Sequence, residues 1–220
     1  MAEINLLDRY PRTSRPIESR AKVVTEADKV LASQFGRDYF DGDRRHGYGG
    51  YHYHPRFWQE SVRRIRDHYE LAANASVLDI GCGKGFTLYD FKELMPELTV
   101  TGLDISEYAL GHAPDPVKGA LVRGTAEALP FADDSFDLVL CMNTVHNLPI
   151  ERCKTAIQEI QRVSKQHAFL TVDAWRNDAE KDQLWKWVVT CLTAMHVDDW
   201  TRLFSEVGYS GDFYWFFPDE

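Results

Sequence analysis

The sequence predicts an α/β fold, a doubly wound, mostly parallel Rossmann-like sheet with an N-terminal helical cap. Two observations lead to this prediction. After Asn74, short apolar runs alternate with helical stretches, which is the pattern of βαβ units. A glycine-rich turn follows the first of these runs, at a position where open parallel sheets bind ligands. We therefore assign residues 1–72 to a helical cap, or lid, and residues 73–220 to the sheet domain.

The cap has apolar residues at helical spacing. Two helices are expected, one over Val24, Ala27, Leu31 and Phe35, and one over Trp58, Val62, Ile65 and Tyr69. Between them runs a loop rich in glycine, tyrosine and histidine, DGDRRHGYGGYHYHPRFW, at 41–58.

The sheet domain divides into short apolar runs and the helical stretches between them. Strands are expected at 77–80, 98–103, 120–122, 138–141 and 168–172, and helices at 87–95 and 151–163. Asp198 or Asp199 is expected to cap a last helix, which Gly208 ends. An aromatic strand at 213–217 follows it.

Composition places limits on the class of protein. With 220 residues, 44% hydrophobic and 27% charged, the chain suits one globular unit with one core. It holds no apolar run long enough to span a bilayer, and its N-terminus lacks the apolar core of a secretion signal. We therefore expect a cytoplasmic protein without a membrane partner. The four cysteines are far apart and are expected to be reduced thiols.

Charge is distributed unevenly along the chain. The formal net charge of −9 argues against a nucleic-acid surface. Residues 1–66 carry 13 Lys and Arg against 9 Asp and Glu, whereas residues 67–220 carry 12 against 25. The basic groups are therefore concentrated in the cap.

The stretch VLDIGCGKGF at 77–86 places a strand directly before a glycine-rich turn and a helix. Gly81, Gly83 and Gly85 leave room for a ligand to approach the backbone, and the helix N-terminus offers free N–H groups. A dinucleotide fingerprint needs glycine where Phe86 stands, and a triphosphate-binding lysine motif is missing. Asp104 ends the second strand, where a carboxylate can accept hydrogen bonds from both hydroxyls of a ribose. The motif predicts an adenosine-containing ligand.

The chain resembles the class I S-adenosylmethionine-dependent methyltransferases, in particular their broad small-molecule group. The resemblance covers residues 75–175 and rests on VLDIGCGKG (77–85), TGLDIS (101–106), GTAEALPFADDSFDLV (124–139), MNTVHNLP (142–149) and EIQRVSKQHAFLTVD (159–173). It implies S-adenosyl-L-methionine as cofactor and S-adenosyl-L-homocysteine as product. The cofactor-binding residues that it implies are Asp79, Gly81, Cys82, Gly83, Gly85, Asp104, Ile105, Thr125, Ala126, Glu127 and Asn143.

Within that set, the resemblance implies a role for each part of the site. The glycine-rich loop would hold the methionine end with support from Asp79, and Asp104 would bind the ribose. Ile105 would pack on the adenine, Ala126 would meet the adenine edge through its backbone, and Asn143 would line the methyl-transfer region.

The sequence also departs from the family pattern. Thr125 stands where the family often has aspartate, and Lys165–Ala168 replaces a Lys-Pro-Gly-Gly turn. The family sheet normally ends in an antiparallel hairpin, yet only twelve residues follow Gly208. The last strand is therefore expected to be missing, very short or displaced.

Methyl transfer from a sulfonium is an in-line displacement, so the protein mainly aligns the nucleophile and excludes water. A hydroxyl or protonated amine also needs a base. His146, just past the fourth strand, and Asp173, after the fifth, are the candidate catalytic residues. The structural alternatives are that His146 caps the next helix or bonds within a wall, and that Asp173 is a turn or cap residue.

The loop at 41–58 allows three interpretations. Its histidines, His46, His52 and His54, suggest a metal site, but no acidic or cysteine set completes it and this chemistry needs no metal, so we predict none. Its arginines interleaved with aromatics suggest nucleic acid, which the net charge and the lack of an NPPY-type sequence after the fourth strand disfavour.

The third interpretation is a lid over a small-molecule pocket. Arg44, Arg45 and Arg56 could then pair with a carboxylate or phosphate of the substrate, and tyrosines could supply rigid contact area. The predicted substrate-binding residues are Arg44, Arg45, His46, Tyr48, Tyr51, His52, Tyr53 and Trp175. The alternative is a loop that only seals the cofactor.

These observations predict a S-adenosylmethionine-dependent methyltransferase acting on N or O of a small polar, anionic metabolite. Two alternatives stay open, an RNA or other nucleic-acid methyltransferase and a non-catalytic S-adenosylmethionine-binding subunit. The sequence gives no indication of the oligomeric state.

Overall fold

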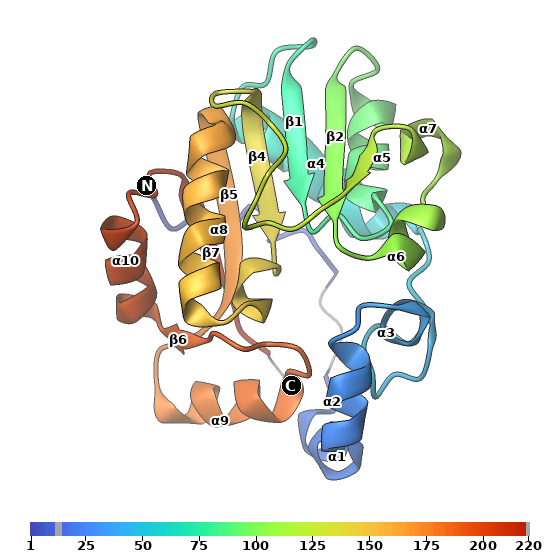
Figure 1. Ribbon diagram of the computed structural model, residues 1–220, viewed down its shortest axis with the longest axis vertical. Coiled ribbons are helices and arrows are strands. Elements are labelled where there is room, and N and C mark those ends of the chain that lie inside the picture. Colours follow the sequence, from blue (N-terminus) through green and yellow to red (C-terminus); the bar gives the residue numbers. More distant parts are fainter. Residues whose placement is uncertain (12–14, 219–220) are drawn as a thin grey trace.

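A seven-stranded sheet forms the centre of the protein, for which a computed structural model describes residues 1–11 and 15–218 (Figure 1). The strand order is β3-β2-β1-β4-β5-β6, and β7 pairs with β5. The strands are β1 (Ser76–Ile80), β2 (Thr99–Asp104), β3 (Leu121–Arg123), β4 (Phe136–Met142), β5 (Ser164–Trp175), β6 (Met195–His196) and β7 (Asp212–Phe216). Their pairings are parallel, so the doubly wound, mostly parallel sheet predicted from the sequence is confirmed.

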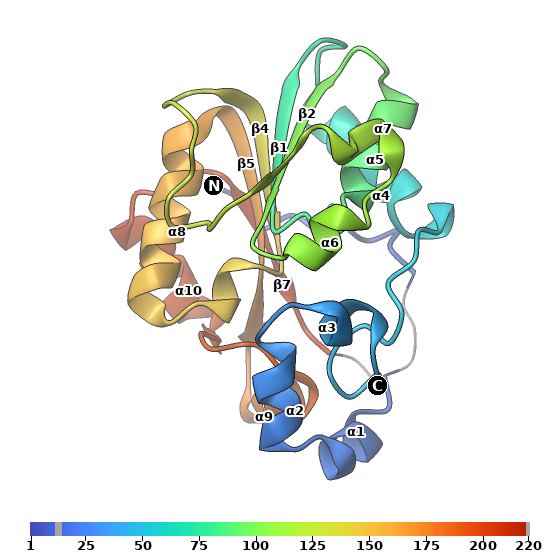
Figure 2. The same cartoon turned by 45° about the vertical axis from the view of Figure 1, so that its right-hand side comes forward.

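Helices cover both faces of this sheet (Figures 1 and 2). One face packs against α8 (Ile150–Val163) and α10 (Val197–Glu206), whose core includes the fully buried Trp200 and Phe204. The other face packs against α4 (Pro55–His68), α5 (Phe86–Leu94), α6 (Glu107–Gly111) and α7 (Asp115–Lys118). Phe91 of α5 is fully buried there. Two apolar cores thus hold the strands in place from either side.

The last strand differs from the hairpin that the family resemblance implies. β6 has only two residues, and α10 then carries the chain back to the opposite end of the sheet. Because a helix intervenes, β7 enters parallel to β5, with Leu170 opposite Phe213. The aromatic strand expected at 213–217 is therefore present. The N-terminal segment continues this edge, since Ile4 N–H donates to the Phe213 carbonyl at 2.9 Å.

Several predicted element boundaries were wrong for local reasons. The first of the two helices predicted in the cap, α2 (Glu26–Ala32), starts two residues after Val24 because Thr25 and Asp28 form a capping box. α10 is capped by His196, whose Nδ1 accepts from Asp198 N–H at 3.2 Å, and not by an aspartate. Residues 165–168, which stand where the family has a turn, are part of β5. The pairing of β4 with β5 shifts register between Phe136 and Leu138 and so accommodates them.

The cap, defined from here on as residues 15–54, lies beyond the carboxyl ends of the strands (Figures 1 and 2). It comprises α1 (Ile17–Val23), α2, α3 (Arg37–Asp41) and the loop after them, and it faces α9 (Asp178–Trp187). α4 belongs instead to the helical layer on the sheet, where it packs against α5. A domain boundary at residue 72 stays a prediction. None of the described helices is both long and apolar enough to cross a lipid bilayer.

Phe91→Ala tests the core under α5. The substitution removes a fully buried ring, so the free energy of unfolding should fall by about 3–5 kcal/mol in urea titrations. Glu93→Ala on the exposed side of the same helix is the control and should change it by less than about 0.5 kcal/mol. Equal losses in the two variants would contradict this packing.

Candidate active site

Two adjoining cavities lie between the cap and the carboxyl ends of the strands. The larger has a volume of 710 Å³ and the smaller 150 Å³. Both are lined by Tyr39, Tyr48, Tyr51, Gly81, Met142, Asn143 and Asn147. A ligand in one cavity would therefore meet a ligand in the other at this shared wall.

The smaller cavity is built around the Asp104 carboxylate at the end of β2. Its Oδ2 accepts from Gly83 N–H and its Oδ1 from Ser106 N–H, each at 2.7 Å. Burial raises the pKa of Asp104, and these N–H groups partly offset that effect. Because an ionised carboxylate has about four acceptor sites, both oxygens can still accept hydroxyl groups from a ligand. Ile105 beside it keeps 52% of its surface exposed at the cavity.

Glycine is required where the loop after β1 meets the shared wall. Gly81 has φ +75°, and a Cβ there would lie 2.0 Å from the Thr144 hydroxyl oxygen. Gly83, also at positive φ, lies under the cap, since its Cβ would come 3.4 Å from the Phe40 ring. Gly85 lies outside both cavities, at the start of α5.

Asp79, near the end of β1, is a buried carboxylic acid in the wall of the larger cavity. Burial, together with the nearby Asp104, raises the pKa of Asp79 to about 8. An ammonium group of a ligand would favour its ionised form. The site thus has a place for a cationic group beside the glycine-rich loop.

His146 and Asp173, the candidate catalytic residues, lie next to one another in the larger cavity. His146, on the 3₁₀ helix η1 (Val145–Asn147), accepts from Asp173 N–H through Nδ1 at 3.0 Å. Its neutral ring therefore carries the proton on Nε2, which lies 3.5 Å from Asp173 Oδ2. Burial lowers the pKa of His146 and raises that of Asp173, and each residue partly offsets the shift of the other. The carboxylate is thus the more available proton acceptor, and the histidine positions it.

The cap supplies part of each cavity wall. Tyr48 and Tyr51 line both cavities, with ring centroids 4.3 Å apart, while Arg44 and His52 line the larger one. The larger cavity also includes Arg20, which sequence reasoning missed. Arg20 lies on the seven-residue helix α1, where no apolar periodicity signals a helix.

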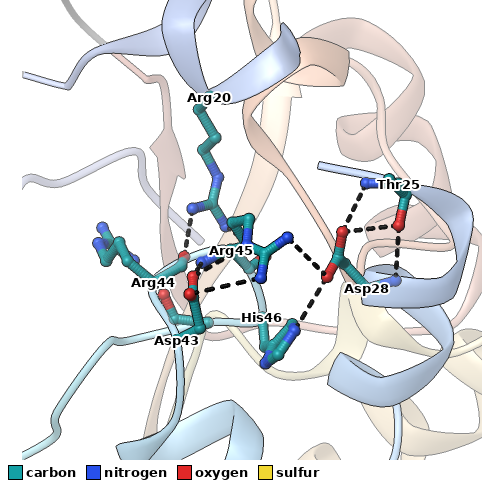
Figure 3. A network of polar contacts seen from close by, with 8 residues as sticks. Arg20, Thr25, Asp28, Asp43, Arg44, Arg45 and His46 are labelled. Carbon is teal, nitrogen blue, oxygen red and sulfur yellow. Dashed lines mark hydrogen bonds and ion pairs between the residues drawn. The ribbon is translucent and has the colours of Figure 1, made fainter. Parts of the chain in front are cut away.

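Other predicted substrate-binding residues lie outside both cavities. His46 Nε2 is 2.9 Å from Asp28 Oδ1, and Arg45 pairs with Asp28 and Asp43, so both hold the loop to α2 (Figure 3). Tyr53 donates to Asp90 at 2.6 Å on α5. Trp175 packs near the Trp185 ring, 6.4 Å between centroids. These contacts give the four residues positions in the scaffold of the site.

A buried ion pair joins the cap to the glycine-rich loop. Lys84 Nζ lies 2.7 Å from Asp41 Oδ2 and donates to the Tyr51 carbonyl at 2.7 Å. Tyr108 O–H also donates to Asp41 at 2.7 Å. Burial alone would raise the pKa of Asp41, but the bonds from Lys84 and Tyr108 outweigh it and hold that pKa well below its ordinary value. We call this group the Lys84–Asp41 latch.

Comparison with known proteins agrees with this geometry. Residues 77–168 match the family model described as a methyltransferase domain. An uncharacterized methyltransferase of Bacillus subtilis, YcgJ, is 39% identical over 47% of this chain and 42% of its own length. Its crystal structure superposes with a TM-score of 0.52 and 26% identity, over 66% of each chain. Together these matches support a class I methyltransferase domain in this chain.

Two further relatives of this chain are named for different acceptors. A demethylmenaquinone methyltransferase of Lactiplantibacillus plantarum is 34% identical over 63% of this chain and 62% of its own length. A tRNA (carboxymethyluridine(34)-5-O)-methyltransferase of Arabidopsis thaliana is 32% identical over 59% of this chain and 31% of its own length. The chain thus matches less than two thirds of each of these curated relatives.

The smaller cavity, its shared wall and Asp79 in the larger cavity together fit S-adenosylmethionine. Asp104 can accept the ribose hydroxyls, the exposed Ile105 offers an apolar surface for adenine, and buried Asp79 suits the ammonium group. Glu127, which also lines the smaller cavity, is held by Arg152 of α8 at 2.6 Å. Among residues 1–11 and 15–218, no group of three His, Cys, Asp or Glu side chains could hold a metal ion.

Asp79→Asn tests the buried acid through pH dependence. The raised pKa means that folded Asp79 stays protonated while the unfolded chain ionises above about pH 4, so stability falls as the pH rises towards about 8. The variant removes this cost and should gain roughly 5 kcal/mol over the wild type near pH 8, and little near pH 4, in urea titrations. Exposed Asp67→Asn is the control, and a gain independent of pH would refute the assignment.

The Lys84–Asp41 latch predicts how the cap is held. Asp41→Asn leaves a buried lysine without its counter-charge, so the cap should open more often and the protein should lose about 3–5 kcal/mol of stability. Hydrogen exchange at residues 42–50 is the measurement. Lys84→Met together with Asp41→Asn should recover part of the loss, whereas additive effects would argue against coupling through this pair.

Proposed function

We propose that this methyltransferase uses S-adenosylmethionine to methylate N or O of a small, polar, anionic acceptor held in the 710 Å³ cavity. The observation that supports this proposal most is the shared wall of the two cavities. Gly81 and Asn143 belong to both, so the cofactor and the acceptor would meet beside them. The volume of the larger cavity falls within the usual range for small-molecule sites.

The chain contributes binding, alignment and proton transfer. When bound, S-adenosylmethionine supplies an electrophilic methyl group on a sulfonium. Asp104 and Asp79 orient the cofactor through its ribose and ammonium groups, and Tyr48 and Tyr51 keep water away from the shared wall. Asp173 accepts the proton that the acceptor loses, while the Nε2–H of His146 holds its carboxylate in position.

The open alternatives lead to different measurements. A nucleic-acid acceptor, as in the tRNA methyltransferase relative, predicts RNA binding that weakens steeply with salt. A non-catalytic subunit predicts cofactor binding without methyl transfer to any acceptor tested. The position of the larger cavity under the cap favours a small acceptor over a nucleic acid.

Asp104→Ala tests cofactor binding directly. Loss of two charge-assisted contacts to the ribose should weaken S-adenosylhomocysteine binding at least about tenfold in calorimetry. Asp133→Ala, an exposed aspartate of the same domain, is the control and should bind as the wild type does. No binding by the wild type, or equal affinity in Asp104→Ala, would remove the proposed function.

A further inference from the structure

One end of the larger cavity holds arginines that meet on a single indole ring. The guanidinium carbons of Arg15, Arg20 and Arg44 lie 5.6, 5.0 and 5.4 Å from the centroid of Trp187. All four residues line the cavity. Arg20 and Arg44 come from the cap, and Trp187 is the last residue of α9. Cap and sheet domain together therefore form this cluster.

Neither Arg20 nor Arg44 forms an ion pair with a carboxylate in the described part of the chain. Arg20 donates to the backbone carbonyls of Trp187, Arg44 and Arg45, at 3.1, 2.5 and 3.5 Å, and Arg44 donates to the Gly47 carbonyl. The neighbouring Arg45 instead pairs with Asp28 and Asp43 (Figure 3). Adjacent arginines of one loop thus have different electrostatic surroundings.

A guanidinium carries five N–H donors. Arg20 uses three of these donors and Arg44 uses one. Two N–H groups of Arg20 and four of Arg44 therefore have no protein acceptor among residues 1–11 and 15–218. Arg20 is only 8% exposed, and burial together with Arg44 lowers its pKa to about 10. Two like charges in a partly buried site repel one another, and a bound anion would relieve that repulsion.

We propose that Arg20, Arg44 and Trp187 form the subsite for a carboxylate or phosphate group of the acceptor. This inference rests on the proposed function and assigns the anionic group of the acceptor to this cluster. The contacts with the indole restrict the two guanidiniums, so little freedom is lost when an anion binds between them. Forked guanidinium donors suit the planar or tetrahedral oxygens of both anions.

The arginine cluster and the candidate base belong to the same cavity. Residues 187–191 line it without interruption, and the Cys191 thiol bonds to Asp173. One small acceptor can therefore place its anionic group at the arginines and its nitrogen or oxygen towards Asp173.

Calorimetry on the full chain saturated with S-adenosylhomocysteine tests the subsite. Inorganic phosphate and acetate are titrated separately at constant ionic strength, and the tighter of the two identifies the anion. Wild type and Arg45→Gln should bind it equally, because Arg45 lies outside the cavity. Arg44→Gln should bind it at least about tenfold more weakly, with S-adenosylhomocysteine affinity unchanged.

Equal anion affinity in Arg44→Gln and the wild type would overturn the subsite, as would no binding of either anion by the wild type. If the wild type does not bind S-adenosylhomocysteine at all, the proposed function itself is refuted. If Arg44→Gln does not retain S-adenosylhomocysteine binding, Arg44→Lys replaces it. This variant keeps the charge without the fork and should still bind the anion at least about threefold more weakly.

Discussion

Because the strands run parallel, their carboxyl ends meet at one edge, and the polar residues at those ends are brought together there. Asp79 comes from β1, Asp104 from β2, Asn143 from the end of β4 and Asp173 from β5. Burial among apolar neighbours favours the neutral form of each of these acids. The cap covers this edge of the sheet. It excludes water from the acids and supplies arginines that balance their negative charge.

Polar contacts tie the cap to the sheet domain and also brace it internally. The Lys84–Asp41 latch ties it to the glycine-rich loop, and the contacts of Arg45 and His46 with Asp28 tie the loop after α3 to α2 (Figure 3). Between these contacts, Tyr48 and Tyr51 form the wall common to both cavities. The excess of basic residues in the N-terminal segment thus has two uses, since some arginines brace the cap and others face the cavity.

Much of the sheet could be predicted because its strands are buried runs separated by helices, and Asp104 and Gly81 could be placed because each follows such a run. The direction of β7 could not be predicted, since it depends on α10 returning the chain across the sheet. The cap was harder for a similar reason. Loop composition alone does not distinguish Arg44 from Arg45, and only the position of Asp28 on α2 decides that Arg45 turns away from the cavity.

The charged groups of the larger cavity differ in how they respond to ligands. Asp79 is held towards its neutral form by burial, whereas Arg20 and Arg44 remain ionised at neutral pH. The arginine cluster is therefore positive before any ligand binds. An ammonium group of the cofactor beside Asp79 would favour the ionised carboxylate, so Asp79 would release its proton when the cofactor binds. This release would disappear above about pH 8, where Asp79 is already ionised. The buried acid Asp79 and the two arginines thus allow one cavity to accept both a cationic and an anionic group.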